Sequence, residues 1–399
     1  MLVQFRVRNV LSFKDEAVLD MRAVNSYKEH QDNLISVENG ESLLKVVSIY
    51  GANASGKSNL FFAMKYFQSI IIESMNNVNK NEDYAIKEYY YPFSLDNSVE
   101  NSEFEIVLIL DEFEYTYGFE YNEKYIVEEW LYRKNLQTKR TSKILERTRE
   151  LAEFGSKVKK ECDLYKKQIP EESLVLSFFN KLNLETDIFR IVFDEIMNIL
   201  LFPTDFCEDV ESLENFLPKV IDFAKPKLLK FLNAIDSGIE NIEYLKGEKE
   251  NDIKFVTYHR SEDGEFYPLN LYSESEGTLK SIMLFMYANA MIFSNSIIFV
   301  DELNTKLHPL VLKFFIDLFY EADSKAQLIY TTHDTTLMDK KFFRRDQICF
   351  VQKDEFGHSK LYAMSDFKVR SDASFEKDYL AGVYGGIPFL KEFSLQEEK

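Results

Sequence analysis

The chain has 399 residues, of which 45% are hydrophobic and 29% are charged. This composition is typical of a globular protein with one large domain or two to three ordinary ones, and no run approaches the ~20 apolar residues of a membrane-spanning helix. The net charge of −19 excludes a general binder of polyanions. Contact with nucleic acid is therefore possible only through a local basic patch or, indirectly, through a second subunit. The basic clusters at 133–143, 157–167 and 340–345 are more typical of solvated surfaces.

Cysteine usage and the first residues favour the cytoplasm. The scattered cysteines form neither a disulfide framework nor a zinc-binding spacing: Cys162, Cys207 and Cys349. Residues 1–8 alternate like a strand and lack the form of a signal peptide. We therefore expect a cytoplasmic protein that does not associate with membranes.

A phosphate-binding motif follows the first strongly apolar run. Residues 43–50 predict a buried strand, and residues 59–67 predict a buried helix. The octapeptide between them, GANASGKS, fits the pattern G-x-x-x-x-G-K-[ST], in which backbone N–H groups and a helix N-terminus face an anion. We expect Lys57 to reach the β- and γ-phosphates of a nucleotide and Ser58 to hold Mg²⁺. The expected nucleotide-binding residues here are Gly51, Ala52, Asn53, Ala54, Ser55, Gly56, Lys57, Ser58 and Asn59.

The middle of the chain changes from strand to helical periodicity. Residues 104–110, 113–121 and 126–131 predict an antiparallel meander. From about residue 143, apolar residues recur three and four apart, as in 174–182, 188–201 and 213–232, and four prolines interrupt the pattern. We interpret residues 143–240 as an inserted helical lobe. Strand character returns at 252–258.

The last part of the chain supplies polar residues at the ends of apolar runs. Residues 296–302 predict a buried strand that ends in Asp301, suited to hold Mg²⁺, and Glu302, suited to orient or deprotonate a water molecule. A further strand, residues 327–332, delivers His333, a candidate sensor of the terminal phosphate. Before the apolar helix predicted at 281–292, a capping sequence forms a second anion-binding candidate: Ser275, Gly277 and Thr278.

Together these motifs resemble an ABC-type ATPase head of the RecF, SMC and OLD branch. Residues 51–58 resemble the Walker A motif, 297–302 the Walker B motif, 275–278 the signature motif and 304–309 the D-loop, with His333 as the switch histidine. Segments 5–13, 346–351 and 379–388 resemble a narrower group, the stand-alone ATPases of bacterial anti-phage and abortive-infection operons of the RloA, AbiL and AriA type.

The chain departs from the motifs of that branch at several positions. Glu274 replaces the usual leucine of the signature, Glu276 replaces a glycine, and Lys306 stands where the D-loop often has a small residue. Gln68 lies too close to the first helix to serve as the Q-loop glutamine.

The resemblance implies an α/β fold, an ABC-type P-loop ATPase head with a mixed sheet, flanking helices and an antiparallel meander, interrupted by the helical lobe. The expected division is 1–142 for the first half of the head, 143–240 for the lobe and 241–399 for the second half.

The resemblance also implies a function, with ATP and Mg²⁺ as ligands and Lys57, Glu302 and His333 as catalytic residues. Two heads would dimerise around ATP, as a homodimer or higher homo-oligomer, with Ser275 and Gly277 of one head capping the nucleotide of the other. By analogy, the chain would sense a phage cue and control a separate toxic effector, such as a TOPRIM-like or RloB-like nuclease. Two alternatives are a RecF-like DNA-repair clamp and a nucleotide-binding module with negligible turnover.

Overall fold

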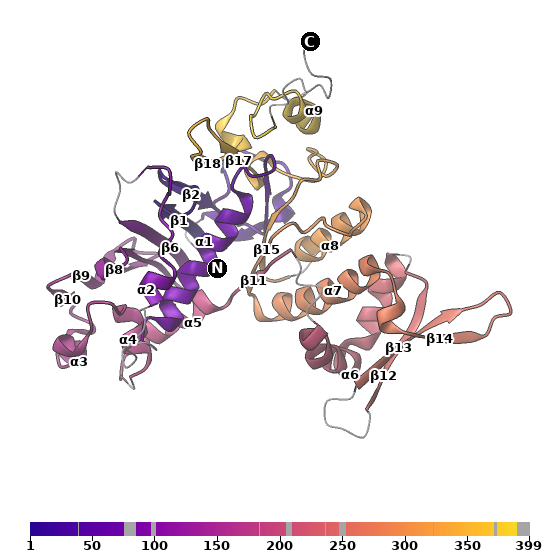
Figure 1. Ribbon diagram of the computed structural model, residues 1–399, viewed down its shortest axis with the longest axis horizontal. Helices are drawn as coiled ribbons and strands as arrows, with labels where there is room; N and C mark the ends of the chain where they lie inside the picture. Colours follow the sequence, from indigo (N-terminus) through magenta and orange to yellow (C-terminus); the bar gives the residue numbers. More distant parts are fainter. Residues whose placement is uncertain are drawn as a thin grey trace, which may run out of the picture.

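The computed structural model describes residues 1–38, 40–75, 85–96, 101–182, 184–204, 210–235, 237–246, 253–321, 323–370 and 373–388. Two large sheets pack around helix α1, and a smaller sheet extends away from the body as an arm (Figure 1). Cys207 lies outside the described residues. Within the described part of the chain, no helix has both the length and the apolar run needed to cross a bilayer.

The central sheet has the strand order β11-β15-β16-β5-β17-β18, parallel except for the β17–β18 hairpin. Every residue of β5, β15 and β16 is buried, as expected when both faces of a parallel sheet are covered. The strands are β5 (Val46–Tyr50), β11 (Ile199–Phe202), β15 (Ile297–Val300), β16 (Gln327–Thr331), β17 (Ile348–Lys353) and β18 (Ser359–Ala363).

The two faces of the central sheet contribute to different cores. Val47, Ile49 and Phe299 pack in the core that holds α1 (Lys57–Glu73) and the second large sheet. Their neighbours along the strands, which point the other way, join the core of α7 (Glu276–Ser294) and α8 (Pro309–Glu321): Val46, Tyr50, Ile298, Val300 and Leu328. Figure 1 shows α1 on one side of β15 and the α7–α8 pair on the other.

The second large sheet is an antiparallel meander of order β10-β9-β8-β7-β6-β1-β2. The meander predicted from the sequence is confirmed in β6, β7 and β8, but the helical pattern expected from residue 143 is wrong at its start. There β9 and β10 extend the sheet, because β9 pairs along the free edge of β8. The bounds are β1 (Leu2–Arg8), β2 (Ala17–Asp20), β6 (Ser102–Leu110), β7 (Phe113–Tyr121), β8 (Ile126–Asn135), β9 (Thr141–Thr148) and β10 (Ala152–Phe154).

Helices predicted in the middle segment are confirmed, with two differences. Residues 199–202 form β11 and pair with β15 instead of continuing α5. Pro218 and Pro226 lie inside α6 and do not end it, because its apolar face is buried at Leu217, Leu228 and Leu232. The helices are α3 (Lys159–Cys162), α4 (Val175–Asn180), α5 (Ile188–Met197) and α6 (Val210–Ala234).

This middle segment therefore supplies strands to both large sheets as well as helices. Its treatment as one helical lobe, and the division into three parts, stay predictions.

The arm is an antiparallel sheet of order β12-β13-β14, made of β12 (Ile239–Lys246), β13 (Ile253–Arg260) and β14 (Phe266–Asn270). A short 3₁₀ turn, Leu271–Ser273, connects β14 to α7. The remaining elements are the hairpin β3 (Leu34–Ser36) and β4 (Ser42–Leu44), with the short helices α2 (Ala85–Glu88) and α9 (Phe375–Leu380).

Candidate nucleotide-binding site

Three parallel strands of the central sheet end together. In register, Ile49 of β5 lies beside Thr331 of β16, and Val300 of β15 lies beside Tyr330. The loop after β5, the acidic pair after β15 and the histidine after β16 therefore meet at one edge of the sheet, where α/β proteins bind ligands.

The phosphate loop needs glycine at position 56. Gly56 has a φ of +111°, and a Cβ built there would lie 2.4 Å from Ser359 Oγ and 2.7 Å from Ser12 Oγ. The Ser359 hydroxyl in turn donates to the Ser55 carbonyl oxygen at 2.6 Å. Ser12 of the N-terminal segment and Ser359 of the β17–β18 hairpin thus lie against the phosphate loop, and any side chain at position 56 would displace the loop.

Helix α1 presents its N-terminus to the loop without a competing side chain. Its N-cap is Gly56, with no side-chain cap, and its first turn has no acidic residue. The first N–H groups of a helix have no partner within it, so this end of α1 suits a phosphate. Ser58 lies half-buried in the first turn, and the Asn59 amide donates to Ser12 Oγ at 2.7 Å. In this structure the expected nucleotide ligand Asn59 thus binds a protein hydroxyl.

Lys57 is a buried cation close to two carboxylates. Its Nζ donates to the carbonyl oxygens of Gly51 at 2.9 Å and Ala52 at 3.0 Å. Burial lowers the pKa of Lys57 to about 8, while the charges of Glu302 and Asp301 oppose the shift. The ammonium group would recover its usual pKa if a polyanion entered the loop.

The acidic pair after β15 is held by Thr331. Its hydroxyl donates to Asp301 Oδ1 at 2.6 Å and accepts the Glu302 backbone N–H at 2.7 Å. Asp301 is almost fully buried, and Thr204 Oγ1 lies 3.4 Å from its second oxygen. One hydroxyl therefore fixes both the carboxylate and the turn that follows the strand.

Glu302 points toward the histidine. Its φ of +49° turns the chain sharply out of β15. His333 Nε2 lies 3.4 Å from Glu302 Oε1, and Thr305 Oγ1 lies 3.5 Å from Glu302 Oε2. Both side chains are about one third exposed, so the carboxylate faces a region that water and a phosphate group can enter.

The side chains present fit a magnesium nucleotide. Mg²⁺ prefers a few protein oxygens supplemented by water and phosphate oxygens, and Ser58 and Asp301 offer a hydroxyl and a carboxylate. The uncapped start of α1 and the buried Lys57 ammonium suit the phosphates.

The signature candidates lie at the start of α7, which contacts the loop that follows Glu302. Ser275 Oγ accepts the Thr278 N–H at 3.1 Å and so caps α7, on the face of the sheet opposite α1. A Cβ at Gly277 would lie 2.9 Å from the Lys306 carbonyl oxygen. Lys280, fully buried, donates to the Thr305 carbonyl oxygen at 2.8 Å. The start of α7 therefore rests on the D-loop of its own chain, and Ser275 is exposed.

Sequence reasoning missed the residues that support the site. Thr331 stands in the predicted strand, but a threonine there carries no signal beyond β propensity. Ser12, Ser359 and Lys280 come from distant segments, and only the fold shows their contacts. Gln68 donates to the carbonyls of Ile196 and Ile199.

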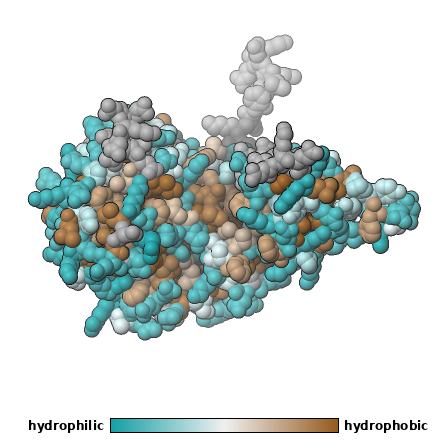
Figure 2. Space-filling view, turned by 90° about the horizontal axis from the view of Figure 1, so that it is seen from below, coloured by the Kyte–Doolittle hydropathy of each residue, from teal (hydrophilic) through white to brown (hydrophobic). Residues whose placement is uncertain are grey.

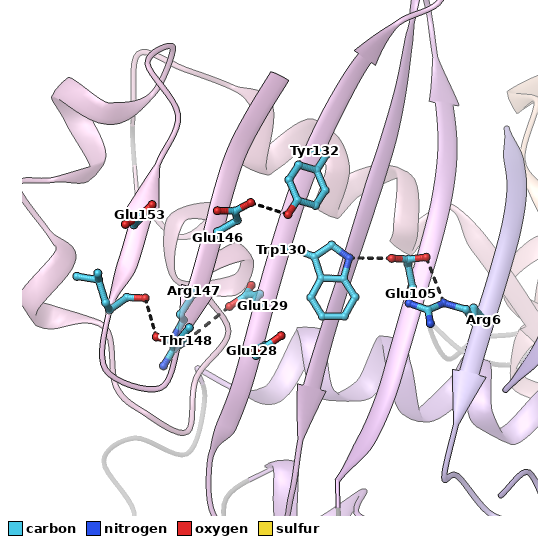
Figure 3. Close-up of a pocket in the computed structure, with 11 residues that line it drawn as sticks. Arg6, Glu105, Glu128, Glu129, Trp130, Tyr132, Glu146, Arg147, Thr148 and Glu153 are labelled. Atoms are coloured by element: carbon cyan, nitrogen blue, oxygen red, sulfur yellow. Dashed lines mark hydrogen bonds and ion pairs between the residues drawn. The ribbon is translucent and has the colours of Figure 1, made fainter. Parts of the chain in front are cut away.

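A cavity with a volume of about 600 Å³ lies elsewhere, on the outer face of the meander (Figure 3). Its polar groups are engaged with one another: Glu105 accepts from the Trp130 indole N–H at 2.8 Å and from Arg6, and Glu146 accepts from Tyr132. Glu129 at its base accepts two N–H groups from the start of α4, and burial raises its pKa. These contacts stabilise the meander.

The mixed sheet, its flanking helices and the antiparallel meander confirm the fold class predicted from the sequence, that of an ABC-type P-loop ATPase head. Residues 46–339 match the family model described as "AAA domain, putative AbiEii toxin, Type IV TA system", and the chain belongs to this family. No curated protein matches the chain.

Three solved SMC heads are structurally similar at low sequence identity. An SMC head bound to the C-winged helix domain of ScpA has 14% identity and a TM-score of 0.46, over 95% of this chain and 99% of that chain. An SMC head domain from Thermotoga maritima has 14% identity and a TM-score of 0.44, over 91% and 98%. An Smc head with an extended coiled coil, bound to the C-terminal domain of ScpA derived from Pyrococcus furiosus, has 13% identity and a TM-score of 0.44, over 95% and 98%.

Proposed function

We propose that the protein binds and hydrolyses ATP with Mg²⁺ at the edge of the central sheet. The observation that carries the proposal is the convergence of Lys57, Asp301, Glu302 and His333 from three strands, with His333 Nε2 3.4 Å from Glu302 Oε1. Burial makes the charged form of Lys57 costly, although Glu302 and Asp301 offset part of this cost, and perturbed groups of this kind gather at functional sites.

Each residue has a role that its position supports. Lys57 and the free N–H groups of α1 bind phosphate oxygens. Ser58 and Asp301 would hold Mg²⁺, which would supply positive charge beside the phosphates. Glu302 accepts a proton from the attacking water, and His333 donates a hydrogen bond to the terminal phosphate.

We further propose that two copies close around two nucleotides. Ser275 is exposed at the start of α7, and together with Gly277 and Thr278 it can cap a partner's nucleotide. A two-fold arrangement would complete both sites in the same way.

The decisive variant is Glu302→Gln. It removes the base but keeps the size of the side chain, so we expect ATP turnover to fall about 100-fold or more while ATP affinity is retained. The variant should also accumulate as an ATP-dependent dimer, measured by light scattering after size exclusion. Glu150→Gln, at an exposed carboxylate outside the site, is the matched control. Ordinary turnover by the Glu302→Gln protein would refute the catalytic assignment.

The biological proposal is that this ATPase controls a separate toxic effector in anti-phage defence, such as a TOPRIM-like or RloB-like nuclease. The family description, which names a toxin of a type IV toxin–antitoxin system, supports a role in such a system but leaves open that the chain is itself the toxin. Expression of the chain alone and together with the product of the neighbouring gene separates the two. Toxicity of the chain alone would contradict control of a separate effector.

The RecF-like alternative requires a basic surface for DNA. Four basic residues of the clusters at 133–143 and 340–345 are paired with acids: Lys134 with Glu114, Lys143 with Glu146 and Glu153, Arg344 with Asp346, and Arg345 with Glu29. These pairs argue against a DNA clamp. DNA binding that needs ATP and weakens steeply with salt would instead support it.

A further inference from the structure

The arm ends in a strand whose apolar side chains face solvent. In β14, Phe266 is 50% exposed, Tyr267 53% and Leu269 45%. The strand lies at the edge of its sheet, but Pro268 lacks an N–H, which disfavours the addition of another strand. The arm therefore offers side chains, and apolar side chains gathered on a projecting element indicate a contact surface (Figure 1).

One face of the arm is joined to the signature motif. Paired residues of neighbouring strands point to the same face, and β14 pairs Leu269 with Thr257 and Tyr267 with His259. Thr257 donates to Glu274, and His259 Nε2 lies 2.7 Å from the same carboxylate. Tyr267 and Leu269, which we call the arm patch, thus share the face that holds the residue immediately before Ser275. Phe266 and Pro268 point to the opposite face.

A second apolar surface lies beside the phosphate loop. The turn between β17 and β18 comes at the same edge of the sheet as that loop, because β17 runs parallel to β5 and Ser359 binds the Ser55 carbonyl. Phe356 in this turn is 66% exposed. Leu95, 73% exposed, packs against the same turn at Gly357. We call Leu95 and Phe356 the rim patch.

On the face drawn in Figure 2, hydrophobic residues gather in patches between hydrophilic ones. Each patch described above accompanies one half of the proposed composite site. The rim patch flanks the phosphate loop, and the arm patch is joined to Ser275 through Glu274.

We propose that the arm patch of one copy docks on the rim patch of a second copy when two heads close on ATP. This inference rests on the proposed function, since it places the contact beside each nucleotide. In a two-fold pair the contact forms twice, because each copy offers its arm to the other's rim. Glu274 then links formation of the contact to the position of Ser275. The arm thereby makes nucleotide-dependent closure specific for another copy of this chain.

The test is a double-mutant cycle on the Glu302→Gln protein with ATP, with the dimer dissociation constant measured by sedimentation. Leu269→Ser and Leu95→Ser should each weaken the dimer about 10-fold or more, and together they should weaken it no further than either alone. Phe266→Ser, on the opposite face of the same strand, should change it less than about twofold. All three positions are exposed, so folding should be retained, which circular dichroism checks.

The outcomes separate the inference from the proposed function. If the Glu302→Gln protein itself stays monomeric with ATP, the proposed head closure fails. If it dimerises and Leu269→Ser dimerises equally well, the docking of the arm is overturned. Effects of Leu269→Ser and Leu95→Ser that simply multiply would also overturn it, because independent effects mean that the two residues do not meet.

Discussion

Replacement of Thr331 by valine would test whether a single hydroxyl organises the acidic end of β15. Thr331 is fully buried, and its side chain connects Asp301 Oδ1 to the Glu302 N–H. Valine has nearly the same shape but neither donates nor accepts. Asp301 Oδ1 and the N–H of Glu302 would both lose their partner, the Thr331 hydroxyl.

The structure sets the size of the effect. A hydrogen bond to a charged group contributes about 1.5–3 kcal/mol, and an unsatisfied N–H costs about 1–3 kcal/mol when buried. Because the Glu302 turn is partly exposed, water offsets part of the second term. We therefore expect Thr331→Val to lower the free energy of unfolding by about 2–4 kcal/mol. ATP turnover should fall as well, since Glu302 loses its fixed orientation.

Urea unfolding and steady-state ATP turnover measure the two effects. Thr331→Ser is the matched control: it keeps the hydroxyl and loses one methyl group, which costs about 1 kcal/mol. If Thr331→Val were as stable and as active as Thr331→Ser, the hydroxyl would not hold the acidic pair, and the geometry described for this edge would be of no consequence.

Two further predictions concern the phosphate loop. Gly56→Ala should lower ATP affinity about 10-fold or more, since the left-handed backbone costs about 1–2 kcal/mol and two serine hydroxyls lie too close to the added Cβ. Nucleotide titration measures the affinity. The control is Gly264→Ala, also at positive φ but with open space around it, which should leave ATP affinity unchanged. Burial lowers the pKa of Lys57 to about 8, so above that pH the free protein has partly lost this proton, whereas bound phosphates favour the charged form. Calorimetry in buffers of different ionisation enthalpy should therefore show net proton uptake on ATP binding that grows between about pH 7 and pH 9; uptake that stays constant would contradict it.

Sequence patterns predicted the strands of the central sheet at which the apolar run and the residues that end it both indicate a strand. The strands before Gly51, Asp301 and His333 are short apolar runs that end abruptly at glycine or polar residues, which is typical of buried parallel strands. The ends of these strands meet because parallel strands present the same ends at one edge of a sheet. The part of the candidate site that a single chain supplies could therefore be predicted from the topology alone.

The features that sequence patterns missed depend on partners distant in the chain. Strand β9 is rich in charged residues whose pairs lie across the sheet, as between Lys143 and Glu153, so its local pattern is ambiguous. Strand β11, Ile199–Phe202, is apolar on every side and too short to be told from the end of a helix. Pro218 is tolerated inside α6 because burial of the apolar face outweighs one lost hydrogen bond. In each case tertiary packing overrides local propensity.

In the proposed closed pair of heads, the hydrogen bond from Lys280 to the Thr305 carbonyl would join two regions that serve different nucleotides. The helix that would reach toward the neighbour's ATP is fastened to the loop whose Thr305 hydroxyl touches the chain's own Glu302. A shift of that helix when the heads close would therefore also affect Glu302, the carboxylate proposed to activate water. Dimerisation would therefore couple the two sites, since each molecule would activate its own ATP hydrolysis by binding the other.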